Sequence, residues 1–131
     1  MSQVSLEEAY RQIARYRRLA NWRTAKGEFP DAKDAEFDDS SWDEFSPGYG
    51  WNRKEGERWF RREIVIPEEI HGVPLEGSRV EVRLFFLAGA ELFIDSRFVA
   101  SDAYWFDGIH TLTDHAIPGK LHVLAVRSPY S

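Results

Sequence analysis

The fold is decided by residues 79–100, which read Arg79-Val-Glu-Val-Arg-Leu-Phe-Phe-Leu-Ala-Gly-Ala-Glu-Leu-Phe-Ile-Asp-Ser-Arg-Phe-Val-Ala100. In its first part, apolar residues alternate with mostly charged ones, the period-two pattern of a strand that buries one face. Gly89 interrupts this run, and residues 90–94 form a second apolar segment. Asp95-Ser96 stands where a tight turn would send the chain back on itself. We expect three consecutive strands in the middle of one sheet.

Further strand patterns flank this stretch. Residues 58–66 end at Pro67, whose ring removes a donor from the strand ladder. Residues 120–127 are rich in branched side chains, as expected of a last buried strand. Residues 109–117 are a mixed segment that ends in turn-forming residues. Because turns rather than helices separate these segments, we predict a mainly β fold, an antiparallel β-sandwich.

The N-terminal part has a helical pattern instead. Ser5-Leu6-Glu7-Glu8 reads as a capping box, and apolar residues recur after it at three- and four-residue spacing. We therefore expect one α-helix before the sandwich. Residues 1–26 would be the N-terminal helix and lead-in, and residues 27–131 the β-sandwich domain. The arginines on the other helix faces are interpreted as a solvated surface rather than a phosphate or membrane patch.

Residues 27–44 are densely acidic and contain the single base Lys33. A calcium loop would need a fixed spacing of ligands and a central glycine, which residues 31–39 lack. We interpret the segment as a solvated acidic loop that faces the basic helix.

The composition limits the classes of function. A chain of 131 residues with 43% hydrophobic residues is long enough for one main domain. Its formal net charge of −5 argues against a dedicated nucleic-acid binder. Without cysteine, it can form neither disulfides nor thiolate metal sites. No apolar run reaches the roughly 18 residues of a membrane span, and the N-terminus lacks the apolar core of a signal peptide. We expect no membrane partner and a cytoplasmic location.

The candidate site is the aromatic, polar loop of residues 101–108, which follows the predicted hairpin. No catalytic residue is assigned, because no Ser stands in a nucleophile-elbow context and the chain has no Cys. The four histidines lack zinc-ligand spacing, so no metal ligand is assigned. Glycoside hydrolysis needs paired carboxylates, and Asp95, Asp102 and Asp107 could approach one another. A turn role for Asp95 and loop-capping roles for the other two are the stronger interpretation.

Five short motifs carry a family resemblance: Phe37-Asp-Asp-Ser-Ser-Trp42, Trp59-Phe-Arg61, Ile64-Val-Ile-Pro67, Leu92-Phe-Ile-Asp95 and Phe98-Val99. Together they resemble the non-catalytic N-terminal domain of large glycoside hydrolases, a galactose-binding-like jelly roll. Family 2 hydrolases (β-galactosidases, β-mannosidases and β-glucuronidases) and family 38 α-mannosidases share this pattern. The predicted helix is more similar to the lead-in of the second family. The resemblance therefore implies an α-mannosidase-like parent enzyme. Asp95-Ser96 departs from the Asp-Gly or Asn-Gly that is usual there.

The resemblance implies an accessory domain that packs on a catalytic domain and helps to frame its sugar cleft. It implies one domain of a longer enzyme or a stand-alone relative, without catalysis by this chain itself. The implied partners are the missing catalytic domain and a mannoside or other sugar. No cofactor is expected in this chain, although a structural calcium is compatible with a jelly roll, and the parent's metal would be bound elsewhere. The implied sugar-binding or interdomain residues are Trp105, Tyr104 and Phe106 for an apolar contact, and Asp102, Asp107 and His110 for hydroxyl groups.

Two alternatives remain open. The same aromatic residues could bury against the missing domain, which would make the chain a structural or protein-interaction module without sugar affinity. The chain could instead be the sugar-binding domain of a family 2 β-glycosidase.

Overall fold

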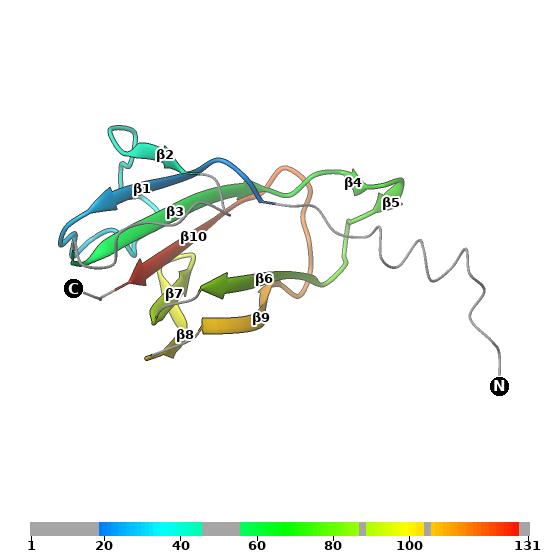
Figure 1. The fold of residues 1–131 in the computed structure, drawn as a ribbon. Coiled ribbons are helices and arrows are strands. Elements are labelled where there is room, and N and C mark those ends of the chain that lie inside the picture. The colour runs from blue at the N-terminus through cyan, green and yellow to red at the C-terminus, as the bar shows by residue number, and fades with distance from the viewer. Residues whose placement is uncertain (1–18, 46–55, 87–88, 104–105, 129–131) are drawn as a thin grey trace.

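Two antiparallel sheets face each other in the computed structural model of the protein, which describes residues 19–45, 56–86, 89–103 and 106–128 (Figure 1). The larger sheet has six strands in the order β2 (Asp43–Phe45), β1 (Trp22–Lys26), β3 (Arg58–Val65), β10 (Leu121–Ser128), β7 (Ala90–Ile94) and β8 (Arg97–Asp102). The smaller sheet pairs β6 (Val80–Phe86) with β9 (Phe106–Thr113). A hairpin of β4 (Glu69–Ile70) and β5 (Val73–Pro74) extends beyond both sheets in Figure 1.

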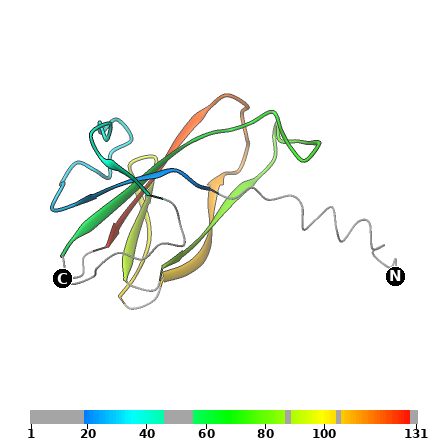
Figure 2. The same ribbon diagram turned by 45° about the horizontal axis from the view of Figure 1, so that its top comes forward.

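The main core lies between the two sheets, which the turned view of Figure 2 separates into layers. Alternating residues of β6 and β9 face alternating residues of β7 and β10 across it, as the period-two pattern requires. The buried members from these four strands are Val82, Leu84, Leu112, Ala90, Leu92, Ile94, Leu124 and Val126. The predicted β-sandwich is therefore confirmed.

The outer face of the larger sheet, which points away from the smaller sheet, is covered by residues 27–42. A second core cluster forms there from Ala32, Trp42, Trp59, Phe93 and Ala125. Because both faces are covered, β10 is buried without interruption from His122 to Val126. This explains why its sequence does not alternate cleanly between apolar and polar residues.

The predicted turn at Asp95-Ser96 is confirmed, and it joins β7 to β8. Both residues have a positive φ, 50° and 70°, a conformation that costs a non-glycine residue about 1–2 kcal/mol. The Ser96 hydroxyl accepts a hydrogen bond from the backbone N–H of Ala35 at 2.8 Å. The Asp95 carboxylate accepts one from the Val123 N–H at 2.8 Å and lies 2.7 Å from Nδ1 of His122. The serine at the usual glycine position thus ties residues 27–42 to the turn.

The predicted strands at 58–66 and 120–127 are confirmed as β3 and β10. The prediction of one central sheet is wrong, because β6 lies in the smaller sheet whereas β7 and β8 lie in the larger one. The chain crosses from one layer to the other near Gly89. The aromatic loop is also shorter than predicted, since β8 continues to Asp102 and β9 begins at Phe106.

The predicted helix lies mostly outside the described residues, and the division at residue 26 stays a prediction. Trp22, which lies within the predicted helix and lead-in of residues 1–26, begins β1 as a buried core residue. In the described ranges no helix has the length and apolar character needed to cross a membrane.

Candidate functional site

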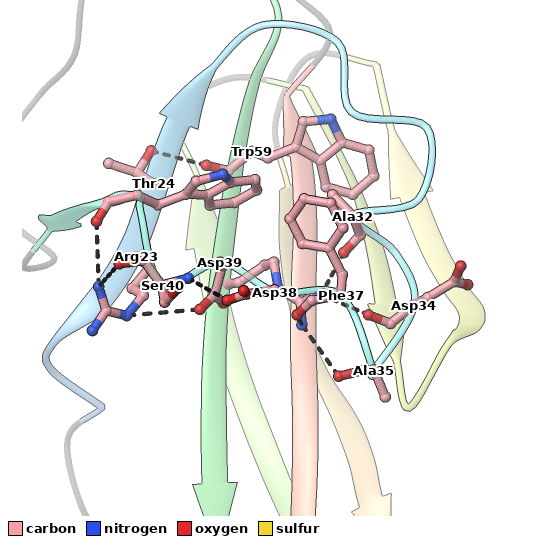
Figure 3. A network of polar contacts seen from close by, with 12 residues as sticks. Arg23, Thr24, Ala32, Asp34, Ala35, Phe37, Asp38, Asp39, Ser40 and Trp59 are labelled. Carbon is pink, nitrogen blue, oxygen red and sulfur yellow. Dashed lines mark hydrogen bonds and ion pairs between the residues drawn. The ribbon is translucent and has the colours of Figure 1, made fainter.

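Arg61 of β3 is the buried charge that organises the acidic segment after β1, whose residues Ala32, Asp34, Ala35, Phe37 and Asp39 are labelled in Figure 3. Its side chain has 0% exposure, and its Nε donates to Oδ2 of Asp39 at 2.9 Å. The other four N–H groups donate to backbone carbonyls, those of Ala32 at 2.5 Å, Asp34 at 2.9 Å, Ala35 at 3.3 Å and Phe37 at 3.1 Å. All donors of the guanidinium are therefore used, which is the condition for burying a charge at tolerable cost.

Most of the acidic side chains of residues 27–44 are exposed, as predicted, but this network shows that the segment is held on the sheet, and the basic helix that it was predicted to face lies outside the described residues. The carboxylate of Asp39 points to Arg61 and lies 3.7 Å from Nε of Arg23, so its partners come from β3 and β1. Ala32 and Trp42 are buried on the sheet. The segment is a fixed wall of the sandwich, and it borders one of the grooves described below.

The first groove, which we call the edge groove, lies between β8 and β9 and has a volume of about 420 Å³. It is lined by Arg97, Phe98, Val99, Ile109, His110 and Thr111. Two of these side chains are large, apolar and exposed, Phe98 at 56% and Ile109 at 63%. The His110 ring lies over Gly108, because a Cβ added to that glycine would stand 2.8 Å from Nε2. The edge groove thus presents apolar surface beside one imidazole.

The residues predicted as a sugar-binding or interdomain site are only partly described. Asp102 is exposed at the end of β8, and His110 lies in the edge groove. The backbones of Phe106 and Asp107 begin β9, where they pair with Phe86 and Phe85. Tyr104 and Trp105 lie outside the described residues. Of the described residues in this set, only His110 lines the edge groove, and the role of all six in sugar contact stays a prediction.

The second groove, which we call the outer groove, lies on the outer face of the larger sheet and has a volume of about 320 Å³. Residues 28–33 form one side of it, and the starts of β3 and β7 with the end of β10 form the other. It is lined by Glu28, Phe29, Pro30, Lys33, Glu57, Trp59, Glu91 and Arg127. Trp59 is 3% exposed and stacks on Phe93 with ring centroids 6.0 Å apart.

Arg127 is held between two carboxylates in the outer groove. Its Nε donates to Oε1 of Glu57 at 2.5 Å, and its Nη1 donates to Oε1 of Glu91 at 3.0 Å. Partial burial disfavours the charged guanidinium, but the hydrogen bonds and charges of Glu57 and Glu91 outweigh this effect and raise the pKa of Arg127 above its ordinary value. The three side chains therefore form a fixed array of donors and acceptors at the groove wall.

Neither groove has the features of a hydrolytic centre in the part of the chain that the structure describes. Both carboxylates at Arg127 accept hydrogen bonds from the guanidinium, whereas a glycoside hydrolase needs one carboxyl group to protonate the leaving oxygen. No group of three or more His, Asp or Glu side chains within the described ranges could hold a metal ion. The arrangement can bind through hydrogen bonds and apolar contact.

The outer groove could not be predicted from the sequence because its polar residues are far apart along the chain. Glu57 and Glu91 lie 70 and 36 residues before Arg127. One signal was present. Trp59 and Phe60 are adjacent in β3 and lie on opposite faces of the sheet, so both faces of this strand carry a buried aromatic residue. Without the position of residues 28–33, this pattern does not reveal a groove.

Neither protein-family models nor curated protein sequences match the chain. Solved structures do match it. A glycosyl hydrolase family 2 member from Bacteroides cellulosilyticus aligns with a TM-score of 0.71 and 19% identity over 86% of this chain and 17% of that one. A β-glucuronidase from Bacteroides uniformis aligns with a TM-score of 0.67 and 25% identity over 82% of this chain and 14% of that one. A β-glycosidase from Bacteroides vulgatus aligns with a TM-score of 0.63 and 18% identity over 82% of this chain and 16% of that one.

This chain therefore has the fold of a domain found in family 2 glycoside hydrolases, and it spans about one sixth of their length. The predicted likeness to a glycoside hydrolase domain is supported at this level. The preference for a family 38 α-mannosidase is not supported, since these structures are family 2 enzymes or β-glycosidases. The short motifs are common to both families, and the helix that favoured family 38 lies outside the described residues.

Proposed function

We propose that this chain is a non-catalytic accessory domain of a family 2 glycoside hydrolase, which packs on the catalytic domain and helps to frame its sugar cleft. The observation that carries this proposal is the alignment of over four fifths of the chain with one portion of several such enzymes. Those enzymes include β-glucuronidases, so a β-linked glycoside is the proposed substrate class of the parent enzyme. The family 2 alternative replaces the α-mannosidase interpretation.

The proposed contact region is the end of the sandwich where β8 and β9 meet. It comprises the edge groove with His110, together with Asp102, Tyr104, Trp105, Phe106 and Asp107 from the intervening segment. A loop between two strands of a rigid sandwich is a common place for binding groups. The catalytic domain of the parent enzyme and a sugar are the proposed partners of this region.

The absence of catalysis is tested by turnover. The purified chain is incubated with the nitrophenyl β-glucuronide, β-galactoside, β-mannoside and α-mannoside, and we expect no release of nitrophenol above buffer. Release that disappears in Asp102→Asn or Asp107→Asn would assign hydrolysis to this chain and overturn the accessory role.

A second function, a protein-interaction module without sugar affinity, is favoured by one specific observation. Phe98 of β8 and Ile109 of β9 both line the edge groove, and they are 56% and 63% exposed. Apolar side chains gathered on a surface commonly mark an interface. The two functions differ in one measurable property, because only the accessory sugar-handling domain binds saccharides on its own.

A further inference from the structure

We propose that the outer groove binds one pyranose ring of a neutral saccharide. This inference deepens the proposed function and rests on it for the class of ligand. It places the sugar on the face covered by residues 27–42, away from the strand ends of β8 and β9.

The polar wall of the outer groove offers donors and acceptors together. Arg127 uses Nε and Nη1 for Glu57 and Glu91. Within the described part of the chain, Nη2 of Arg127 and the second carboxylate oxygen of each glutamate make no hydrogen bond. Neighbouring hydroxyl groups of a sugar ring each donate and accept, so one ring can engage a carboxylate oxygen and a guanidinium N–H at the same time. Because the ion pairs already fix these side chains, binding would cost little additional ordering.

The other side of the outer groove is apolar. Phe29 and Pro30 border it on the side of residues 28–33, and Trp59 lies beneath it on β3. The C–H face of a pyranose needs such a surface, while its hydroxyl edge needs the polar wall. The indole N–H of Trp59 is buried and has no hydrogen-bond partner among the described residues, so its NMR signal reports on changes at the floor of the groove. The volume of about 320 Å³ lies at the small end of ligand pockets, which fits a single sugar unit.

The charges of the outer groove favour a neutral sugar over a uronic acid. Three carboxylates, Glu28, Glu57 and Glu91, line it together with the two cations Lys33 and Arg127. Arg127 is already paired with two of these carboxylates, so a further anion would meet unfavourable charge. We therefore expect the outer groove to exclude glucuronate, the sugar acid from which the similar β-glucuronidases take their name.

The test is a proton–nitrogen NMR titration of the 131-residue chain with methyl β-galactopyranoside and methyl β-glucopyranoside, with glucuronate as the charged comparison. The indole N–H signal of Trp59 is identified by its loss in Trp59→Phe. We expect saturable shifts of this signal and of the Glu91 and Arg127 amides with at least one neutral glycoside, and weaker shifts with glucuronate. Glu91→Ala, at a side chain that is 33% exposed, should weaken binding by about tenfold or more, because it removes an acceptor and releases Arg127.

Glu63→Ala is the matched control, since Glu63 is an exposed glutamate on β3 of the same sheet and lines neither groove. It should bind the glycosides as the unchanged chain does. If Glu91→Ala disturbs the fold, Glu91→Gln is the substitute variant because it preserves the shape of the side chain. Its loss of glycoside affinity should be intermediate. Shifts confined to Ile109 and His110 would rule out the outer groove as the sugar site and leave the accessory function intact. The same conclusion would follow if Glu91→Ala bound the glycosides as tightly as the unchanged chain. No shift with any glycoside would overturn this inference as well, and equally strong glucuronate binding would refute the charge argument.

Discussion

Replacing the buried Arg61 of β3 by methionine should strongly destabilise the protein. The substitution keeps an unbranched side chain of similar length and removes only the charge and the donors. Arg61 serves Asp39 and four backbone carbonyls from a position with no solvent exposure. Methionine would leave these acceptors facing an apolar side chain.

The magnitude follows from which acceptors can find water. The Ala32 carbonyl belongs to a residue with 0% exposure, and an unsatisfied buried carbonyl costs about 1–3 kcal/mol. Asp39 is 14% exposed and has Arg23 at 3.7 Å, so its charge keeps one partner. Removing one member of a buried ion pair typically costs about 3–5 kcal/mol. We expect a loss of about 3–5 kcal/mol, a large share of the roughly 5–15 kcal/mol that stabilises a small domain.

Urea unfolding followed by tryptophan fluorescence measures this loss, because Trp42 and Trp59 lie in the cluster beneath residues 27–42. Arg62→Met is the matched control, since Arg62 is adjacent in sequence and donates to the Ala20 carbonyl through an exposed hydrogen bond of 2.7 Å. The control should lose about 1 kcal/mol or less. If Arg61→Met unfolds at nearly the same urea concentration as Arg62→Met, the network does not hold residues 27–42 on the sheet.

Three further changes probe other parts of the fold. Ser96→Ala should destabilise the protein by about 1 kcal/mol in urea unfolding, because it loses the hydrogen bond from Ala35 and keeps the positive φ. Ser96→Gly loses the same hydrogen bond but should be nearly neutral, because glycine adopts a positive φ without strain. Equal losses of stability in the two variants would contradict this account. Gly108→Ala should displace the ring of His110, whose Nε2 would stand 2.8 Å from the new Cβ, and unchanged NMR shifts of that imidazole would refute the packing. Hydrogen bonds from the Ser40 side chain and backbone lower the pKa of Asp38, so its contribution to stability is present above its unfolded pKa and is lost as pH falls through the folded pKa. Carboxyl titration by NMR should find this pKa below that of an ordinary Asp, and an ordinary or higher value would contradict the hydrogen bonds.

Strands and their turns could be predicted where the signal is local. Asp95-Ser96 stands between two apolar segments, and the structure has a turn there because residues adjacent in sequence form it. The assignment of β6 and β7 to different sheets could not be predicted. Period-two alternation identifies the buried face of a strand, but both sheets of a sandwich present that face to the same core.

The polar sites could not be predicted because their partners are distant in sequence. Arg61 reads as one of several charges in a strand, and its acceptors lie 22 to 29 residues earlier. Four of these acceptors are backbone carbonyls, which carry no sequence signal. The acidic side chains of the same segment did carry a signal, but it favoured a solvated loop because Asp39 is the only one that the Arg61 network uses.

The central claim is that this chain is a sugar-handling accessory domain, and saturation-transfer NMR on the isolated 131-residue chain tests it most directly. The ligands are galactose, mannose, glucuronic acid and short mannosides, each observed in the presence and absence of calcium. We predict saturation transfer to at least one neutral sugar. Silence across all ligands, from a chain whose amide spectrum is that of a folded β-sandwich, would contradict the sugar-handling role and leave an interaction module.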